Sequence, residues 1–326
     1  MLEEPASRTI PLGSALEFID ALRLTGREWR GGGKNWGFRG QASAEWRLVP
    51  KAFRPGVAPS PASSDSDGLV RLKAVTEILR WEKDRFAEFF NLADAIGLYI
   101  PGAERLHHRD YSRELETGIR GHTWPPEELT EGLAIAQHHG VPTRLLDFTR
   151  NPLVAAFWAG YHAFVDEAAQ GRLAVWAVNL AFVKHAWRTE WNVLLSQYEG
   201  SRIRLVQVPA ARNRFLLAQQ GFFVVDDKAN EECLRGGGPR PVDEVMVERA
   251  EQEDTWVSLQ KNFPQWSQVW DRPVLLKLTL PTSEAARLIE LLYHCEDVSM
   301  ARLMPTFGMV TETVRLMKDV KGRLGE

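Results

Sequence analysis

Apolar and polar positions repeat with two different periods along the chain, one helical and one strand-like. Between residues 69 and 92, apolar side chains recur every three or four positions, which is the spacing of one face of an amphipathic helix. The same period predicts further helices over residues 128–139, 152–164, 284–293 and 312–320. Gly140 follows the first of these, and Asn151-Pro152 precedes the second; both are usual residues at such helix ends.

Short apolar runs predict strands between these helices. They cover residues 143–148, 173–178, 203–208, 222–225 and 274–280. Residues 173–178 are apolar at both alternations, as in a central strand, whereas residues 274–280 have one wetter face. Helices and strands are mixed without a regular strand–helix–strand rhythm, so the pattern predicts an α+β fold.

The chain offers no clear boundary between two domains. Residues 55–68 (PGVAPSPASSDSDG) are rich in proline, serine and aspartate, so we expect a flexible loop there. Neither this segment nor the glycine-rich residues 236–239 separate two cores, because the apolar runs on both sides are short and need each other. The prediction is one composite domain over residues 1–326.

The composition excludes several classes of protein. Of the 326 residues, 44% are hydrophobic and 25% charged, as in an ordinary folded globule. No apolar run approaches the roughly 18 residues that a membrane helix needs, and the first residues lack the layout of a signal peptide. Two cysteines, Cys233 and Cys295, cannot build a disulfide framework or a thiolate zinc cluster. A cytoplasmic protein that does not engage a membrane is the expectation.

The positive charge is unevenly distributed, although the formal net charge is only −3. Thirty of the 40 basic residues are arginines, the side chain suited to planar recognition of anions. Residues 36–56 carry a net +3 and residues 201–225 a net +4, which leaves −10 for the remainder. If the two strips converge, they form a basic pocket suited to a phosphate-bearing ligand. The alternative is two solvated strips that never meet.

Two short motifs carry candidate chemistry. In the first, residues 36–41 (WGFRGQ), a glycine beside Arg39 lets the backbone and the guanidinium approach a flat or anionic ligand together. A surface turn with a solvated arginine is the alternative. In the second, residues 134–149, polar side chains crowd the end of a helix and the start of a strand. These side chains are Gln137, His138, His139, Thr143, Arg144 and Asp147.

Strand alternation places Thr143, Leu145 and Asp147 on one face of the second motif. A buried Asp147 needs a partner, for which an arginine or a backbone N–H is suited. The alternatives are a histidine that caps helix carbonyls and an Arg144 paired with a structural carboxylate. Adjacent histidines on a helix point about 100° apart, and no third ligand follows at the next turn, so no metal site is expected.

These motifs resemble the FRG domain, which is named for its Phe-Arg-Gly motif. The similar segments are Phe38-Arg39-Gly40-Gln41, residues 136–149, residues 151–159, and Arg214 with Gln219-Gln220-Gly221-Phe222. The similarity extends from about Trp36 to Leu316. FRG domains occur in bacterial and phage proteins, in settings that suggest toxin or defence roles.

The layout is also similar to the ADP-ribosyltransferase superfamily, which implies a mixed or antiparallel sheet with surrounding helices and NAD as substrate. The resemblance implies that Arg39 holds the phosphate or ribose of NAD and that a late carboxylate stabilises the oxocarbenium-like ribose. Catalytic roles fall to Arg39, His138 and Asp147. NAD contacts fall to Phe38, Arg39, Gly40, Gln41, Gln137, His139, Thr143, Arg144, Thr149, Arg214 and Gln219.

The identity of the late carboxylate is open on sequence grounds. Its candidates are Asp147, Glu190, Glu199 and Glu312, of which Asp147 lies in the most specific block. The family often carries a Pro-Asp pair near its C-terminal end, but here Pro305 is followed by Thr306.

The leading hypothesis is an ADP-ribosyltransferase-like enzyme that modifies nucleic acid or protein, as a toxin or defence effector with an antitoxin partner. A non-catalytic module that binds a nucleotide or nucleic acid is the alternative. A third class is a partner-binding protein that uses the 12 tryptophans as a docking surface.

Overall fold

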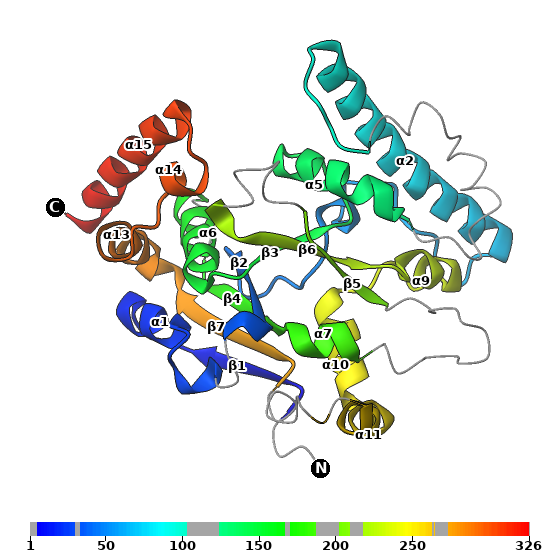
Figure 1. Ribbon diagram of the computed structural model, residues 1–326, viewed down its shortest axis with the longest axis horizontal. Helices are drawn as coiled ribbons and strands as arrows, with labels where there is room; N and C mark the ends of the chain where they lie inside the picture. Colours follow the sequence, from blue (N-terminus) through cyan, green and yellow to red (C-terminus); the bar gives the residue numbers. More distant parts are fainter. Residues whose placement is uncertain are drawn as a thin grey trace.

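A mixed sheet forms the centre of the computed structural model, which describes residues 5–29, 33–102, 124–166, 170–186, 202–208, 218–262, 264 and 273–325 (Figure 1). The described strands are β1 (Ser7–Pro11), β2 (Trp36–Gln41), β3 (Leu146–Thr149), β4 (Arg172–Asn179), β5 (Ile203–Val206), β6 (Gly221–Asp226) and β7 (Leu275–Pro281). They lie in the order β1-β7-β4-β2-β3-β6-β5. Strands β1 and β7 are parallel and every other neighbouring pair is antiparallel.

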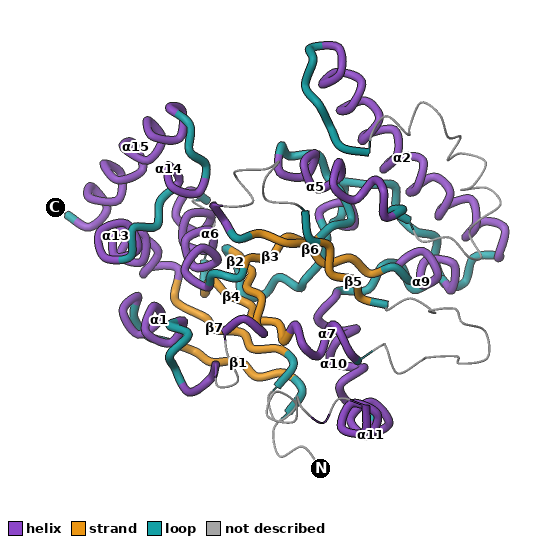
Figure 2. The backbone as a smooth tube through the Cα atoms, viewed as in Figure 1, coloured by secondary structure: helices purple, strands orange, loops and turns teal. Residues whose placement is uncertain are grey.

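Helices surround this sheet in three groups (Figure 2). The first group is α1 (Ala15–Leu22), α6 (Pro152–Val165), α13 (Ala285–Cys295), α14 (Met300–Leu303) and α15 (Phe307–Leu324). The second is α7 (Leu180–His185), α10 (Val242–Glu251) and α11 (Glu253–Asn262). The third is α2 (Gly68–Ala95), α5 (Thr130–His138) and α9 (Ala229–Arg235). This mixture of helices and a mixed sheet confirms the α+β prediction.

Each helix group covers its own hydrophobic cluster. The first group packs on β4 through Leu173, Val175 and Ala177, and the second packs on the opposite face of β4 through Trp176 and Val178. This division follows strand alternation, because successive side chains point to opposite faces. The third group packs on the β5–β6 end of the sheet. Both faces of β4 are therefore buried, as its uninterrupted apolar run predicts.

Strand β2 and helix α6 approach each other with no room for a side chain between them. A Cβ atom at Gly40 would lie 1.9 Å from the carbonyl oxygen of Ala155, so only glycine allows this approach. Helix α6 begins where the sequence predicts, since Asn151 accepts a hydrogen bond from the Leu153 N–H and Pro152 occupies the first turn. The motif around Arg39 is thus an inner strand and not a surface turn.

The predicted strand at residues 143–148 begins later, at Leu146. The cause is local: the Thr143 hydroxyl accepts a hydrogen bond from the Leu145 N–H at 3.2 Å, which replaces a strand ladder contact. Thr143 and Asp147 consequently do not share a strand face. The sequence pattern also missed β1, α1 and the short helices α7, α9, α10, α11 and α14.

Residues 55–67 contain no regular helix or strand, and Asp67 caps the N-terminus of α2 through the Leu69 N–H. Among the described residues, no helix has both the length and the apolar character required to cross a membrane.

Candidate functional site

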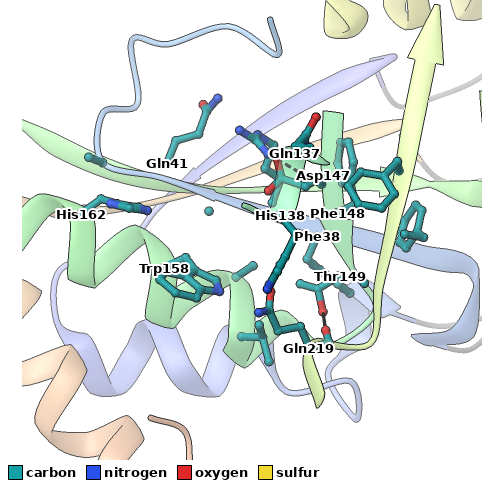
Figure 3. A pocket seen from close by; sticks show the side chains of 18 of the residues that line it. Phe38, Gln41, Gln137, His138, Asp147, Phe148, Thr149, Trp158, His162 and Gln219 are labelled. Atoms are coloured by element: carbon teal, nitrogen blue, oxygen red, sulfur yellow. Dashed lines mark hydrogen bonds and ion pairs between the residues drawn. The ribbon is translucent and has the colours of Figure 1, made fainter. Parts of the chain in front are cut away.

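A pocket of about 660 Å³ opens beside β2, β3 and α6, a volume within the range of about 300–1,000 Å³ that is typical of small-molecule sites (Figure 3). Nine residues predicted for the site line it, namely Phe38, Arg39, Gly40, Gln41, Gln137, His138, Asp147, Thr149 and Gln219. The structure therefore brings together residues from the two motifs and from the later Gln-Gln-Gly-Phe segment.

The pocket exists because the sheet is interrupted between β2 and β3. These strands are paired at Phe38 and Thr149, but the ladder does not continue to Gly40 and Asp147. The side chain of Arg39 occupies the gap instead, and its Nη1 donates to the Asp147 backbone carbonyl at 2.8 Å. A side-chain hydrogen bond thus takes the place of a backbone one and leaves an opening in the sheet.

Arg39 and Asp147 form an ion pair at this opening. Nη1 of Arg39 lies 2.5 Å from Oδ1 of Asp147, and the side chains are 10% and 63% exposed respectively. The Nε of Arg39 is buried and has no hydrogen-bond partner among the described residues. Buried polar groups in folded proteins are nearly always satisfied, so this unpaired N–H is an exception that marks Arg39 as a candidate functional residue.

The environment of Asp147 keeps its carboxylate charged. Desolvation by the surrounding protein raises the pKa of Asp147, but the charge and hydrogen bond of Arg39, aided by Arg54, outweigh it. The net pKa lies below the ordinary value. Desolvation and the Arg39 charge in turn lower the pKa of Arg54, which lines the same pocket. Asp147 is thus an ionised group that lies among many protein atoms and still faces open space.

Two histidines line the pocket in their neutral form at pH 7. Desolvation lowers the pKa of His138, and the neighbouring His139 lowers it further. Desolvation is also the main cause of the lowered pKa of His162 on α6, whose ring stacks on Trp158 with 5.7 Å between centroids. A neutral imidazole can accept a proton, so both are suited to act as a base. Figure 3 shows Gln137 and Asp147 at one end of the pocket and Trp158 with His162 at the other.

Polar residues of the wall are held by the fold. The Gln41 amide accepts from Trp176 Nε1 at 2.9 Å and donates to the Arg47 carbonyl at 3.2 Å. The Thr149 hydroxyl donates to the Gln219 carbonyl at 2.6 Å and so connects β3 to the segment before β6. These contacts shape the pocket and leave Arg39 and Asp147 as its charged pair.

Several predicted site residues do not line the pocket. Arg144 is buried in an ion pair with Glu82, as the structural alternative proposed. Thr143 is buried and donates to Gln137 from behind, and His139 stacks on Phe89 outside the pocket. Arg214 lies outside the described residues.

The basic strips converge only in part. Arg39 and Arg54 of the first strip line the pocket, whereas Arg202 and Arg204 of the second pair with Asp226 and Asp227. Arg212 and Arg214 are not described. Of the four candidate late acids, Asp147 lines the pocket. Glu312 lies on α15 and pairs with Arg315 at 3.3 Å, while Glu190 and Glu199 lie outside the described residues.

The sequence reasoning missed Trp158 and His162, which it left in the apolar helix behind the site. A signal was present, because these residues are four positions apart and therefore share one face of α6. A histidine one turn after a tryptophan on an otherwise apolar helix is a polar exception, and this exception is the signal that could have identified the two residues as part of the site.

Comparison with known families places these residues. The family model described as the FRG domain matches residues 34–167, about two fifths of the chain. Residues 34–167 are thus similar to the FRG domain. The matched segment of the FRG domain includes Arg39, His138, Asp147 and all of α6, and it ends before Gln219. No curated protein and no solved structure matches the chain.

Proposed function

We propose that the pocket of the FRG domain binds NAD and that Asp147 assists cleavage of the nicotinamide–ribose bond, after which ADP-ribose passes to a nucleic acid or protein acceptor. The observation that carries this proposal is the Arg39–Asp147 pair, in which a buried N–H without a partner adjoins an exposed carboxylate. This pair places a cationic hydrogen-bond donor, which can bind an anion, beside a carboxylate, which can stabilise a positive charge.

The cationic side of the pocket suits the phosphates of NAD. A guanidinium offers several N–H groups in one plane, so Arg39 can keep Asp147 on Nη1 while another N–H of the guanidinium donates to a phosphate oxygen. Arg54 adds a second positive charge on the same pocket. Trp158, which stacks with His162 on the same pocket, supplies flat apolar surface for a ring of the nucleotide.

The carboxylate side suits the reaction. When the bond between ribose C1′ and the pyridinium nitrogen breaks, its electron pair leaves with nicotinamide, which becomes neutral, and the ribose becomes oxocarbenium-like. The negative charge of Asp147 stabilises this cation. An acceptor oxygen or nitrogen then bonds to C1′ and gives its proton to a base, the role we assign to neutral His138.

One observation favours a binding module without turnover as a second candidate. The Oδ1 atom of Asp147 already accepts from both Arg39 and Gln137, so its charge is compensated before any ligand arrives. A nucleotide could then bind to Arg39 and stabilise the fold with no bond cleavage.

The test measures nicotinamide release from NAD and the melting temperature in NAD, for the wild type, Asp147→Asn and Asp297→Asn. Asp297 is the matched control. It is an exposed aspartate that does not line the pocket, and its Oδ2 lies 2.9 Å from Nη2 of Arg302. Loss of one charge-stabilising group from an active site costs on the order of 100-fold in rate. We expect that loss for Asp147→Asn and no loss for Asp297→Asn.

Equal release by the wild type and Asp147→Asn would remove Asp147 from the mechanism. Thermal stabilisation by NAD without nicotinamide release would instead support the binding module. If NAD causes neither nicotinamide release nor thermal stabilisation, the assignment of NAD as the ligand is overturned.

A further inference from the structure

Thr143 lies directly behind the pocket wall and reaches Asp147 through one intermediate side chain. Its hydroxyl donates to Oε1 of Gln137, and Nε2 of Gln137 donates to Oδ1 of Asp147 at 3.3 Å. Thr143 is 3% exposed and does not line the pocket, so it touches no ligand there.

The direction of these hydrogen bonds follows from the Asp147 carboxylate, which can only accept. The Leu145 N–H donates to the Thr143 hydroxyl oxygen at 3.2 Å, which leaves the hydroxyl proton to bond Gln137. Donation from Thr143 places the carbonyl end of the Gln137 amide toward Thr143 and its NH₂ end toward Asp147. A flipped amide would set its oxygen against the carboxylate, which repels it.

We propose that Thr143 is a positioning residue that acts through Gln137 to hold the Asp147 carboxylate for the reaction. This inference rests on the proposed function of the same pocket. It replaces the direct ligand contact predicted for Thr143 with a role one layer behind the wall.

The Gln137 contact has a purpose that the Arg39 contact cannot serve. A phosphate bound to another N–H of Arg39 shares the positive charge of the guanidinium with Asp147 and so weakens the attraction between Arg39 and Asp147. The amide of Gln137 is neutral and does not attract the phosphate, so a bound phosphate leaves its hydrogen bond to Asp147 intact. It therefore holds Asp147 in place when the ligand is bound.

The segment that carries Thr143 is anchored on both sides. The Thr143 carbonyl accepts from the Ala52 N–H at 3.1 Å, and the next residue, Arg144, is buried against Glu82. The hydroxyl is thus presented from a fixed backbone, as a positioning group requires.

The test compares Thr143→Val, which removes the hydroxyl, with Thr143→Ser, which keeps it. The matched control is Thr313→Val on α15, because the buried Thr313 hydroxyl also accepts from a backbone N–H, that of Ala301 at 3.0 Å, and donates onward, to the Met309 carbonyl. Each valine variant removes one hydrogen bond that the hydroxyl accepts from a backbone N–H and one that it donates, so the effects of the two variants on folding are comparable.

Two quantities are measured: the pKa of Asp147 by carboxyl carbon NMR, and the pH profile of nicotinamide release. Loss of an ordered N–H donor raises the pKa of a carboxylate. For Thr143→Val we therefore expect a raised pKa of Asp147, an acid limb of activity at higher pH, and a loss of about 10- to 100-fold in kcat/KM. Thr143→Ser and Thr313→Val keep the wild-type values.

Other charged or titratable groups face Asp147 and are common to all variants. They are Arg39 on β2, Arg54 in the segment after it, His138 on α5 and His162 on α6. Because these groups are unchanged, a difference between the valine and serine variants reports the hydroxyl alone.

Gln137→Met is a second test of the inference. It leaves the core packing unchanged, since Gln137 is only half-buried. It should raise the pKa of Asp147 as Thr143→Val does, and adding Thr143→Val to it should cause no further rise. An unchanged Asp147 pKa in Gln137→Met, or an additional rise in the double variant, would overturn the inference.

The pKa readout separates this inference from the proposed function. If the wild type releases no nicotinamide, the proposed reaction fails, but the pKa series still decides whether Thr143 controls Asp147. If release is normal and the pKa series shows no effect, the reaction stands and the positioning role fails.

Discussion

Two arginine–carboxylate pairs involve the same short stretch of chain, but one lies in the core and the other in the pocket. Arg144 and Glu82 are 1% and 3% exposed and lie in the core between α2 and the residues before β3. Only three positions later, Asp147 is 63% exposed and pairs with Arg39 in the pocket. From the sequence, Arg144 and Asp147 were both candidates for one ligand site.

Hydrogen-bond completeness distinguishes the two pairs. Each nitrogen of Arg144 has a partner: Nε and Nη2 donate to Glu82, and Nη1 donates to the Trp124 carbonyl and Asn230. Arg39 leaves a buried Nε without one among the described residues. A fully satisfied arginine holds the protein together, whereas a buried donor without a partner is an exception that points to a functional role.

The largest effect is expected from breaking the buried pair with Arg144→Met. Glu82 would keep a buried charge without a partner, which costs about 3–5 kcal/mol in the free energy of unfolding. Urea denaturation measures this loss, with Arg39→Met as the comparison. Because Asp147 stays largely exposed, we expect Arg39→Met to cost about 1 kcal/mol or less. Similar losses for the two variants would erase the distinction between a core pair and a pocket pair.

A smaller effect, seen in binding and not in folding, is expected from Arg39→Lys. Lysine keeps the positive charge but offers one point of contact, so it cannot hold Asp147 and a phosphate along two directions. Loss of a charged hydrogen bond of about 1.5–3 kcal/mol corresponds to roughly 10- to 100-fold weaker binding of ADP-ribose. Calorimetric titration measures this affinity.

Arg302→Lys is the control for that titration, since Arg302 also pairs with an exposed aspartate. It should bind ADP-ribose as the wild type does. If Arg39→Lys binds equally well, the spare N–H of Arg39 has no part in recognition.

The sequence predicted the parts of this molecule whose signals are local. Helix α2, helix α6 and strand β4 follow from apolar periodicity and from the cap at Asn151. The block around Asp147 was predicted as a site, with an arginine or a backbone N–H as the partner of a buried carboxylate. The structure pairs Asp147 with Arg39, although the Asp147 side chain is largely exposed.

The remaining features depend on contacts between distant segments. Strand alternation could not assign Arg144 to the core, because the Thr143 hydroxyl turns the backbone before the strand begins. The pocket itself arises where the β2–β3 ladder stops, an event that no single segment encodes. For this reason Trp158 and His162, which border the opening, looked like ordinary helix residues.

The smallest expected effect is the pH dependence of the Arg39–Asp147 pair. The folded-state pKa of Asp147 lies below its ordinary value of 3.8, so the folded state favours the charged carboxylate. The resulting stabilisation is fully present above the unfolded pKa and disappears as the pH falls through the folded pKa. Solvent exposure of Asp147 limits it to about 1 kcal/mol or less.

This contribution is measured as the difference in unfolding free energy between the wild type and Asp147→Asn from pH 7 to pH 2.5. We expect the difference to be constant near neutrality, to decrease below about pH 4 and to vanish once the pH lies below the folded-state pKa of Asp147. The lowered pKa values of His138 and His162 produce a separate loss of stability near pH 6 and below, because the unfolded chain binds those protons first. A difference that does not decrease between pH 4 and pH 2.5 would mean that Asp147 contributes through packing instead of charge, and the pocket pair would then resemble the core pair.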